Sequence, residues 1–341
     1  MTRIIDRVGA LRIVLVLAAA IAAWVQFGVR FVVSSAVPPL EAAQSPRSGV
    51  GKTVSINGAN VYYEEMGQGV PLVYTPGGRH DIEVARPLAQ KLARKYRVIL
   101  WERANTGRSD VVYAGVRDVD LWSDQLAEFL RILGVRPAYL AGPSLGGRIS
   151  YVTAIRHPEV VRGLFLYLVS GGDGIAERLA KAYYGDLVEV AEKQGMEAVI
   201  KDAFLAERVA ANPGNRARFL AIDPREFARV MRRWQAAYVS SDPVVEATEG
   251  DLRTLNGSGI PIRIIAGCAD DATHNLVRSQ LFSRIVSNAE FREVPGFCDT
   301  WAKVQKEPGG RDRFGPVYEA HPMVPELIDD FITSTESQRK R

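Results

Sequence analysis

A single serine flanked by two glycines is the clearest chemical signal in the sequence. Residues 139–151 run from an apolar segment through Gly142-Pro143-Ser144-Leu145-Gly146 into a helix-like pattern. A Gly-x-Ser-x-Gly pentapeptide between a strand and a helix is typical of a nucleophile elbow, whose tight turn tolerates only small residues beside the serine. This context disfavours an ordinary Gly/Ser turn. We expect Ser144 to be an exposed nucleophile and the Leu145 N–H, at the helix start, to stabilise an oxyanion.

A glycine pair, Gly77-Gly78, follows the short apolar run 71–74. Glycines allow a backbone to turn its amides toward a substrate, so the Gly78 N–H is the expected partner of the Leu145 N–H. Each such donor stabilises a transition state by about 3 kcal/mol. The alternative is a plain loop. Further candidate substrate contacts are Gly77, Arg79, His80 and Trp234.

The elements around these residues alternate between short apolar runs and helical patterns. A β-hairpin with an Asn-Gly turn is predicted over 53–64. Strands are predicted at 71–74, 97–101, 138–140, 163–168, 260–266 and 290–294, and helices at 83–95, 121–133, after Ser144 and at 324–332. Strands separated by helices predict a mostly parallel sheet, which carries its ligand site at the strands' C-terminal ends.

The segment 171–259 lacks this alternation and shows only helical patterns, at 176–184, 187–204 and 224–238. We therefore predict a helical cap inserted into a core made of residues 52–170 and 260–335. The aromatic residues of the cap suggest a partly apolar pocket, although such residues more often pack a core of their own. They include Tyr183, Tyr184, Phe204, Trp234 and Tyr238.

The N-terminal segment 1–36 contains arginines followed by an apolar run from Ile13 to Val29. About 17 residues give a marginal membrane span. The readings left open are an uncleaved signal anchor, a cleaved signal peptide, and a helix lying on the membrane or on the fold. We favour the anchor with the catalytic domain outside the cytoplasm, and secretion or release into a periplasm is the alternative. Residues 37–51 are typical of a linker.

The composition is that of a globular protein. Among 341 residues, 47% are hydrophobic and 24% charged, and the formal net charge is only +4. Basic residues are scattered, so nucleic-acid binding is not indicated. The two cysteines exclude a disulfide scaffold and a cysteine-based zinc site.

From about Thr53 onward the chain resembles the α/β-hydrolase superfamily. Residues 142–146 match its nucleophile elbow, and 75–78 are similar to its His-Gly-Gly oxyanion turn, with Pro76 in place of the histidine. Residues 101–110 resemble the Asp-x-Arg-Gly-x-Gly-x-Ser loop and 267–270 the loop that bears the catalytic acid. The resemblance implies an α/β fold with a mostly parallel sheet of eight-stranded type, flanked by helices and carrying a helical cap.

The catalytic acid should be one of two neighbours, Asp270 and Asp271. Spacing from Gly267 favours Asp270. The alternative is that both aspartates only cap a helix that begins near Thr273, because aspartate is a preferred capping residue.

The base should follow the acid in the chain. His80 comes too early, and His157 is expected to be structural. We expect the base to be His321, before the final helix, although the position where the family carries its histidine is Phe297 here. His274 is the alternative, but it follows Asp270 so closely that one turn would have to supply both.

Cys268 and Cys298 follow the ends of two adjacent predicted strands. In an exported domain they could form a disulfide that fastens two loops of the site. The competing interpretation is two buried free thiols.

These residues predict a serine hydrolase acting on an ester or related acyl bond of a small, partly apolar substrate. Ser144 would attack the carbonyl, His321 would transfer the proton and Asp270 would orient the imidazole. Serine at the elbow argues against the halide- and epoxide-processing relatives. Still open are C–C hydrolase, thioesterase, acyltransferase and cofactor-free haloperoxidase chemistry, and a non-catalytic membrane-tethered binding protein. No motif implies a metal or an organic cofactor.

Overall fold

The computed structural model describes residues 51–172, 174–239, 243–312 and 315–341. The predicted anchor or signal segment 1–36 lies outside these residues, as does nearly all of the predicted linker. Among the helices of the described ranges, none combines the length and apolar character needed to span a membrane.

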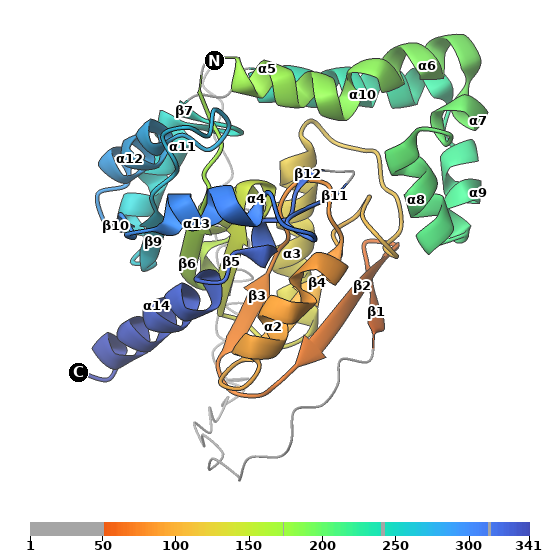
Figure 1. Ribbon diagram of the computed structural model, residues 1–341. Coiled ribbons are helices and arrows are strands. Elements are labelled where there is room, and N and C mark those ends of the chain that lie inside the picture. Colours follow the sequence, from red (N-terminus) through yellow and green to blue (C-terminus); the bar gives the residue numbers. More distant parts are fainter. Residues whose placement is uncertain (1–50, 173, 240–242, 313–314) are drawn as a thin grey trace, which may run out of the picture. The chain divides into compact units, whose positions relative to one another are not determined.

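The described residues form one large sheet of eight strands, as expected (Figure 1). In sheet order the strands are β1 (Lys52–Ile56), β2 (Ala59–Met66), β4 (Arg97–Trp101), β3 (Pro71–Tyr74), β5 (Ala138–Pro143), β6 (Val161–Tyr167), β9 (Ile262–Ile265) and β10 (Ala289–Arg292). The predicted hairpin β1–β2 is antiparallel, β2 pairs antiparallel with β4, and the remaining pairs are parallel. Parallel strands end at one edge, where the loops that carry the candidate site residues begin.

Helices cover both faces of the sheet because alternate strand residues point in opposite directions. Leu72 and Tyr74 join one apolar cluster, while Val73 joins the other. The first cluster includes residues of α2 (Arg86–Leu92), α13 (Phe297–Val304) and α14 (Val324–Arg339); the second includes α3 (Asp118–Ile132), α4 (Ser144–Arg156) and α12 (Leu276–Ile285). The final helix, predicted to end at Ile332, instead continues as α14 to Arg339.

A run of helices between β6 and β9 forms the cap. It contains α5 (Ile175–Ala180), the π-helical turn η3 (Lys181–Gly185), α6 (Asp186–Gln194), α7 (Met196–Val199), α8 (Ala203–Ala211), α9 (Gly214–Leu220) and α10 (Pro224–Val239). These helices share an apolar cluster of their own. The single helix predicted over 187–204 is wrong, because Gly195 adopts φ 75° and Asp202 caps a new helix.

The last part of the predicted cap packs with the core instead. Val244, Ala247 and Leu252 belong to a core cluster, in a segment with β7 (Pro243–Val244), β8 (Ala247–Thr248) and α11 (Glu249–Arg253). Within it the buried Glu246 forms an ion pair with Arg148 of α4 at 2.9 Å. This return segment is therefore fixed to the elbow helix.

Cys268 and Cys298 form a disulfide, which confirms that hypothesis over two free thiols. Cys268 lies in the loop after β9, and Cys298 lies in α13 after β10. Beyond α13 the chain forms a small hairpin, β11 (Arg311–Asp312) and β12 (Gly315–Pro316), and the short helix η5 (Tyr318–Ala320). The disulfide thus joins the segments that follow two neighbouring strands, β9 and β10.

Replacing both Cys268 and Cys298 with alanine is expected to lower the free energy of unfolding by about 2–4 kcal/mol, because the bond restricts the unfolded chain. Denaturant unfolding of the wild type and the double variant measures the difference. Reductant should destabilise only the wild type. Equal thiol titres of the denatured wild type before and after reduction would contradict the bond.

Candidate active site

Ser144 occupies the nucleophile elbow that the sequence predicts. It joins β5 to α4 with φ 45°, in the left-handed region, and its N–H donates to the Leu168 carbonyl at 3.2 Å. A Cβ at either Gly142 or Gly146 would collide with the carbonyl oxygen of Thr75. The chain after β3 therefore passes so close to the elbow that both positions require glycine.

The imidazole of His274 lies between Ser144 and a carboxylate. Its Nε2 is 3.0 Å from Ser144 Oγ, and its Nδ1 is 3.0 Å from Asp271 Oδ2. Ser144 is 7% exposed and His274 only 2%. A hydroxyl, an imidazole and a carboxylate in this order form the hydrogen-bond relay of a serine nucleophile and its base.

One turn after β9 supplies both the acid and the imidazole. Asp271 Oδ1 accepts the N–H groups of Thr273 at 2.9 Å and His274 at 3.0 Å, while Oδ2 holds the His274 ring. The His274 carbonyl accepts the N–H of Cys268 at 3.1 Å, and a Cβ at Gly267 would collide with that carbonyl. Gly267 is therefore what allows the turn to fold back on its own start.

The carboxylate of Asp271 remains ionised in this setting. Burial by itself raises the pKa of Asp271, but the hydrogen bond and charge of the His274 imidazole, with the two backbone N–H groups, lower it to about 2. The negative Asp271 carboxylate beside Nδ1 favours the His274 tautomer that carries its proton on Nδ1. This tautomer leaves Nε2 free to accept a proton from Ser144.

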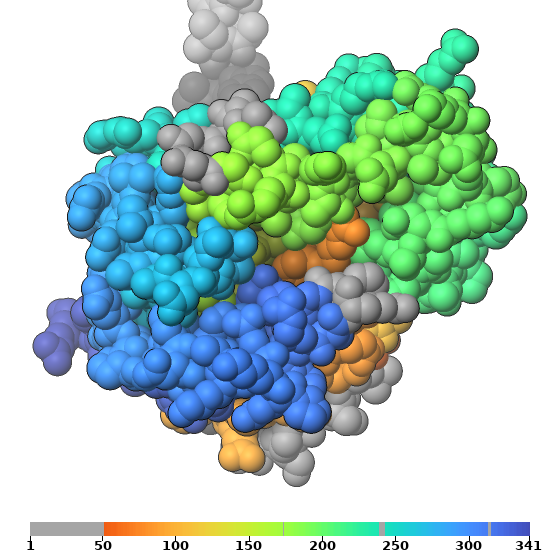
Figure 2. Space-filling view, turned by 45° about the horizontal axis from the view of Figure 1, so that its top comes forward, coloured from red at the N-terminus to blue at the C-terminus, as the bar shows by residue number. Residues whose placement is uncertain are grey.

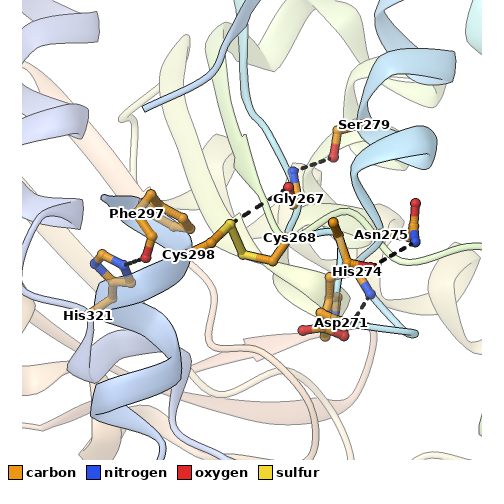
Figure 3. The surroundings of a disulfide bond; sticks show 10 residues. Gly267, Cys268, Asp271, His274, Asn275, Ser279, Phe297, Cys298 and His321 are labelled. Carbon is orange, nitrogen blue, oxygen red and sulfur yellow. Dashed lines mark hydrogen bonds and ion pairs between the residues drawn. A yellow bond between two sulfur atoms is a disulfide. The ribbon is translucent and has the colours of Figure 1, made fainter. Parts of the chain in front are cut away.

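The structure does not bring His321 to Ser144, and this corrects the predicted position of the imidazole. His321 Nδ1 accepts the Met323 N–H at 3.3 Å, so its Nε2–H donates to the Phe297 carbonyl at 3.1 Å. Its ring stacks on Phe297 at 4.0 Å, and burial lowers its pKa. Figure 3 shows His321 and His274 on opposite sides of the disulfide. Both ring nitrogens of His321 are therefore engaged in holding the start of α14.

The predicted acid is also displaced, by one residue. Asp270 is exposed and lines the outer cleft described below, whereas its neighbour Asp271 contacts the imidazole. The alternative was that both aspartates only cap a helix. This does not hold for Asp271, because its carboxylate contacts the His274 ring as well as the backbone. Asn275 caps α12.

The predicted oxyanion residues lie beside Ser144. Gly78 has φ 53°, and its carbonyl accepts Arg103 Nη2 at 2.8 Å, which fixes the turn. Gly78 and Leu145 line the same pocket. The N–H of Gly77 donates to Glu319 Oε1 at 3.0 Å, so Gly77 does not offer its amide to a ligand.

Sequence analysis missed Tyr318 and Glu319, which the small helix η5 brings to the site. The Tyr318 side chain lies next to Ser144, and its ring meets that of His274 edge-on at 5.3 Å. It also packs over Gly77, where a Cβ would collide with it. Both residues lie in the segment between β10 and α14, where no sequence motif identifies either of them.

Two hollows lie next to the candidate site, and Gly78 and Tyr183 line both of them. The inner pocket lies between the core and the cap and is lined by Gly78, Leu145, Arg103, Thr106, Tyr183 and Trp234, among others. The outer cleft is open and more polar, and its lining includes His274, Tyr318, Asp270 and His80. Figure 2 shows the recess between the green cap and the blue C-terminal part of the core, with orange core atoms at its floor.

The other predicted substrate contacts lie at these hollows. Arg79 lies over the rings of Tyr183 and Phe204 and lines the inner pocket with Trp234. His80 lines the outer cleft, but its Nε2 is 3.0 Å from Asp312 of β11. No cluster of three metal-ligating side chains is present within the described part of the chain.

Comparison with known proteins gives the same fold. The family model described as alpha/beta hydrolase fold matches residues 70–172. A putative carbamate hydrolase of Azorhizobium caulinodans is 36% identical over 108 residues, which cover 31% of this chain and 40% of that relative. A 2-hydroxymuconate semialdehyde hydrolase of a Pseudomonas species is 24% identical over 274 residues, which cover 75% of this chain and 89% of that one.

Solved structures agree with this assignment. A thermophilic esterase from Thermogutta terrifontis superimposes with a TM-score of 0.54 at 17% sequence identity, over 84% of this chain and 99% of its own. The residues that match the family model contain the strands β3 to β6 and the elbow at Ser144. Residues 70–172 thus match the α/β-hydrolase family model, and the described chain has the α/β-hydrolase fold.

Proposed function

We propose that the protein is a serine hydrolase that cleaves an ester through Ser144, His274 and Asp271. The observation that carries the proposal is the pair of 3.0 Å contacts that His274 makes, one with the hydroxyl and one with the carboxylate. A binding protein that retained only the fold would not need this alignment.

In the first step His274 Nε2 takes the proton of Ser144 Oγ as that oxygen attacks the ester carbonyl. The developing oxyanion is stabilised by the N–H groups of Gly78 and Leu145. The C–O bond then breaks, and His274 returns the proton to the departing alkoxide. A water molecule, activated by the same imidazole, attacks the acyl-enzyme and releases the acid and free Ser144.

The two hollows suggest how an ester lies in the site. His274 lines the outer cleft, and it must protonate the leaving alcohol, so the alcohol part belongs in that cleft. The acyl part then enters the inner pocket beyond Leu145. Because side chains of the cap such as Tyr183 and Trp234 limit the space in this pocket, we propose a short acyl group and place fewer limits on the alcohol.

The location of the protein remains a proposal from the sequence. Attachment to a membrane through residues 1–36, with the catalytic domain outside the cytoplasm, agrees with the disulfide, since disulfides persist in oxidising compartments. Recovery of the protein in the cytosolic fraction of its native cell would contradict it.

Replacing His274 with alanine, or Ser144 with alanine, is expected to lower kcat/KM for a short-chain activated ester by at least about 10³-fold. The reason is that each change removes one end of the proton transfer. A fluorophosphonate probe should label the wild type and fail to label the Ser144 variant.

His321→Gln is the matched control, because glutamine offers an amide for the bonds of this buried histidine. It should keep kcat/KM within about tenfold of the wild type and act mainly on stability. Full activity of the His274 variant beside an inactive, folded His321 variant would overturn the assignment.

Asp271→Asn is expected to lower kcat/KM by about 10³- to 10⁴-fold, since the neutral amide no longer stabilises the imidazolium. In the wild type the pKa of Asp271, about 2, keeps its carboxylate ionised above roughly pH 3. The asparagine variant therefore lacks a charge that the wild type carries at every pH above about 3.

Asp270→Asn serves as the control for this change, because Asp270 is exposed next to the same turn. We expect an effect of about twofold or less on kcat/KM. A larger loss from Asp270→Asn than from Asp271→Asn would contradict the assigned acid.

A further inference from the structure

The inner pocket contains an arrangement that hydrolysis itself does not require. Arg103 and Thr106, from the loop after β4, and Trp234, from α10 of the cap, all line it. These three side chains are 2%, 1% and 1% exposed. They lie beside Leu145 and Gly78, where the acyl part of an ester is expected.

Each of these three residues has a polar atom without a hydrogen-bond partner. The atoms are Arg103 Nε, Thr106 Oγ1 and Trp234 Nε1. All three can donate, and the guanidinium and indole nitrogens can only donate. A buried donor without an acceptor is destabilising, so three of them among the residues of one pocket point to a ligand rich in acceptors.

The charge of the pocket wall favours an acceptor that is an anion. Burial, and then the neighbouring charge of Arg208, lower the pKa of Arg103 to about 10, so the guanidinium remains cationic at neutral pH. In the described ranges no carboxylate lies within ion-pair distance of Arg103. By contrast, the equally buried Arg148 is paired with Glu246 at 2.9 Å. A buried cation without a counter-charge is costly unless a ligand supplies one.

Other bonds hold this cation in place. Arg103 Nη2 donates to the Gly78 carbonyl at 2.8 Å, and its guanidinium lies 5.1 Å from the centre of the Trp122 ring. Arg208 is fixed nearby by the carbonyls of Asn105 and Arg79, at 3.1 and 2.7 Å. The two guanidinium groups are therefore held in place before a ligand binds.

We propose that this pocket binds a carboxylate carried by the acyl part of the substrate, so that the preferred substrates are half-esters of short dicarboxylic acids. Arg103 supplies the charge, and Thr106 and Trp234 supply hydrogen bonds. The inference rests on the proposed function, because it places the ester carbonyl at Gly78 and Leu145 and the alcohol in the outer cleft.

The test compares two 4-nitrophenyl esters of equal shape, the hemisuccinate and the 4-methylpentanoate, which has an isopropyl group in place of the carboxylate. After subtraction of spontaneous hydrolysis, the wild type should prefer the hemisuccinate in kcat/KM by at least about tenfold, as expected for hydrogen bonds to a charged group. Thr106→Val, which keeps the side-chain shape, should lower this ratio by about tenfold.

Thr335→Val is the matched control, because Thr335 is a buried threonine of α14, 4% exposed and outside both hollows. It should leave the ratio unchanged. A binding measurement needs no turnover: calorimetry with succinate on the Ser144→Ala protein should show binding that Thr106→Val or Arg103→Met weakens by about tenfold or more.

The outcomes separate the subsite from the proposed function. If neither ester is hydrolysed and the fluorophosphonate does not label Ser144, the proposed function fails. If the neutral ester is hydrolysed through Ser144 but the hemisuccinate is not preferred, only the carboxylate subsite is overturned. A preference that Thr106→Val and Trp234→Phe leave intact also overturns it, because the carboxylate would then bind elsewhere.

Discussion

The candidate site depends on one backbone turn that folds back so that its end contacts its start. The turn after β9 bends back until the His274 carbonyl accepts the Cys268 N–H, and it can do so because Gly267 has no side chain in the way. This bend places the Asp271 carboxylate under the imidazole and directs Nε2 toward Ser144. The bond from Cys268 to Cys298 fastens the beginning of the turn to α13. Acid and base thus come from one short segment held by covalent and hydrogen bonds.

The segment after β10 has a different task from the one that the sequence suggests. Its histidine, His321, holds the start of α14, while Tyr318 and Glu319 reach back to the site. Glu319 accepts a hydrogen bond from the Gly77 N–H and so helps to fix the oxyanion turn. Arg103 fixes the same turn by donating to the Gly78 carbonyl. Two segments that are distant in sequence therefore support the site. One is the segment between β10 and α14, and the other is the loop after β4.

The parts of the molecule that were predictable are those that local sequence determines. The elbow at Ser144 follows from two glycines and an apolar strand, and the sheet follows from alternating strand and helix patterns. The identity of the base does not follow in this way, because it depends on a close approach at Gly267 and on a cross-link between distant loops. The Asp271-x-x-His274 spacing, together with the cysteine pair, was the available signal, and the usual position of the family's histidine outweighed it. The position of Tyr318 could not be predicted from the sequence, because only the path of the segment between β10 and α14 brings it to the serine.

The central claim is that His274, and not His321, accepts the proton of Ser144. A halomethyl ketone that resembles a short acyl substrate, and that alkylates an imidazole next to a serine nucleophile, tests it most directly. After inactivation, peptide mapping should find the label on His274 of the wild type, and Ser144→Ala should slow its incorporation, because the ketone first has to engage the serine. Stoichiometric, activity-linked labelling of His321, with His274 unmodified, would contradict the account.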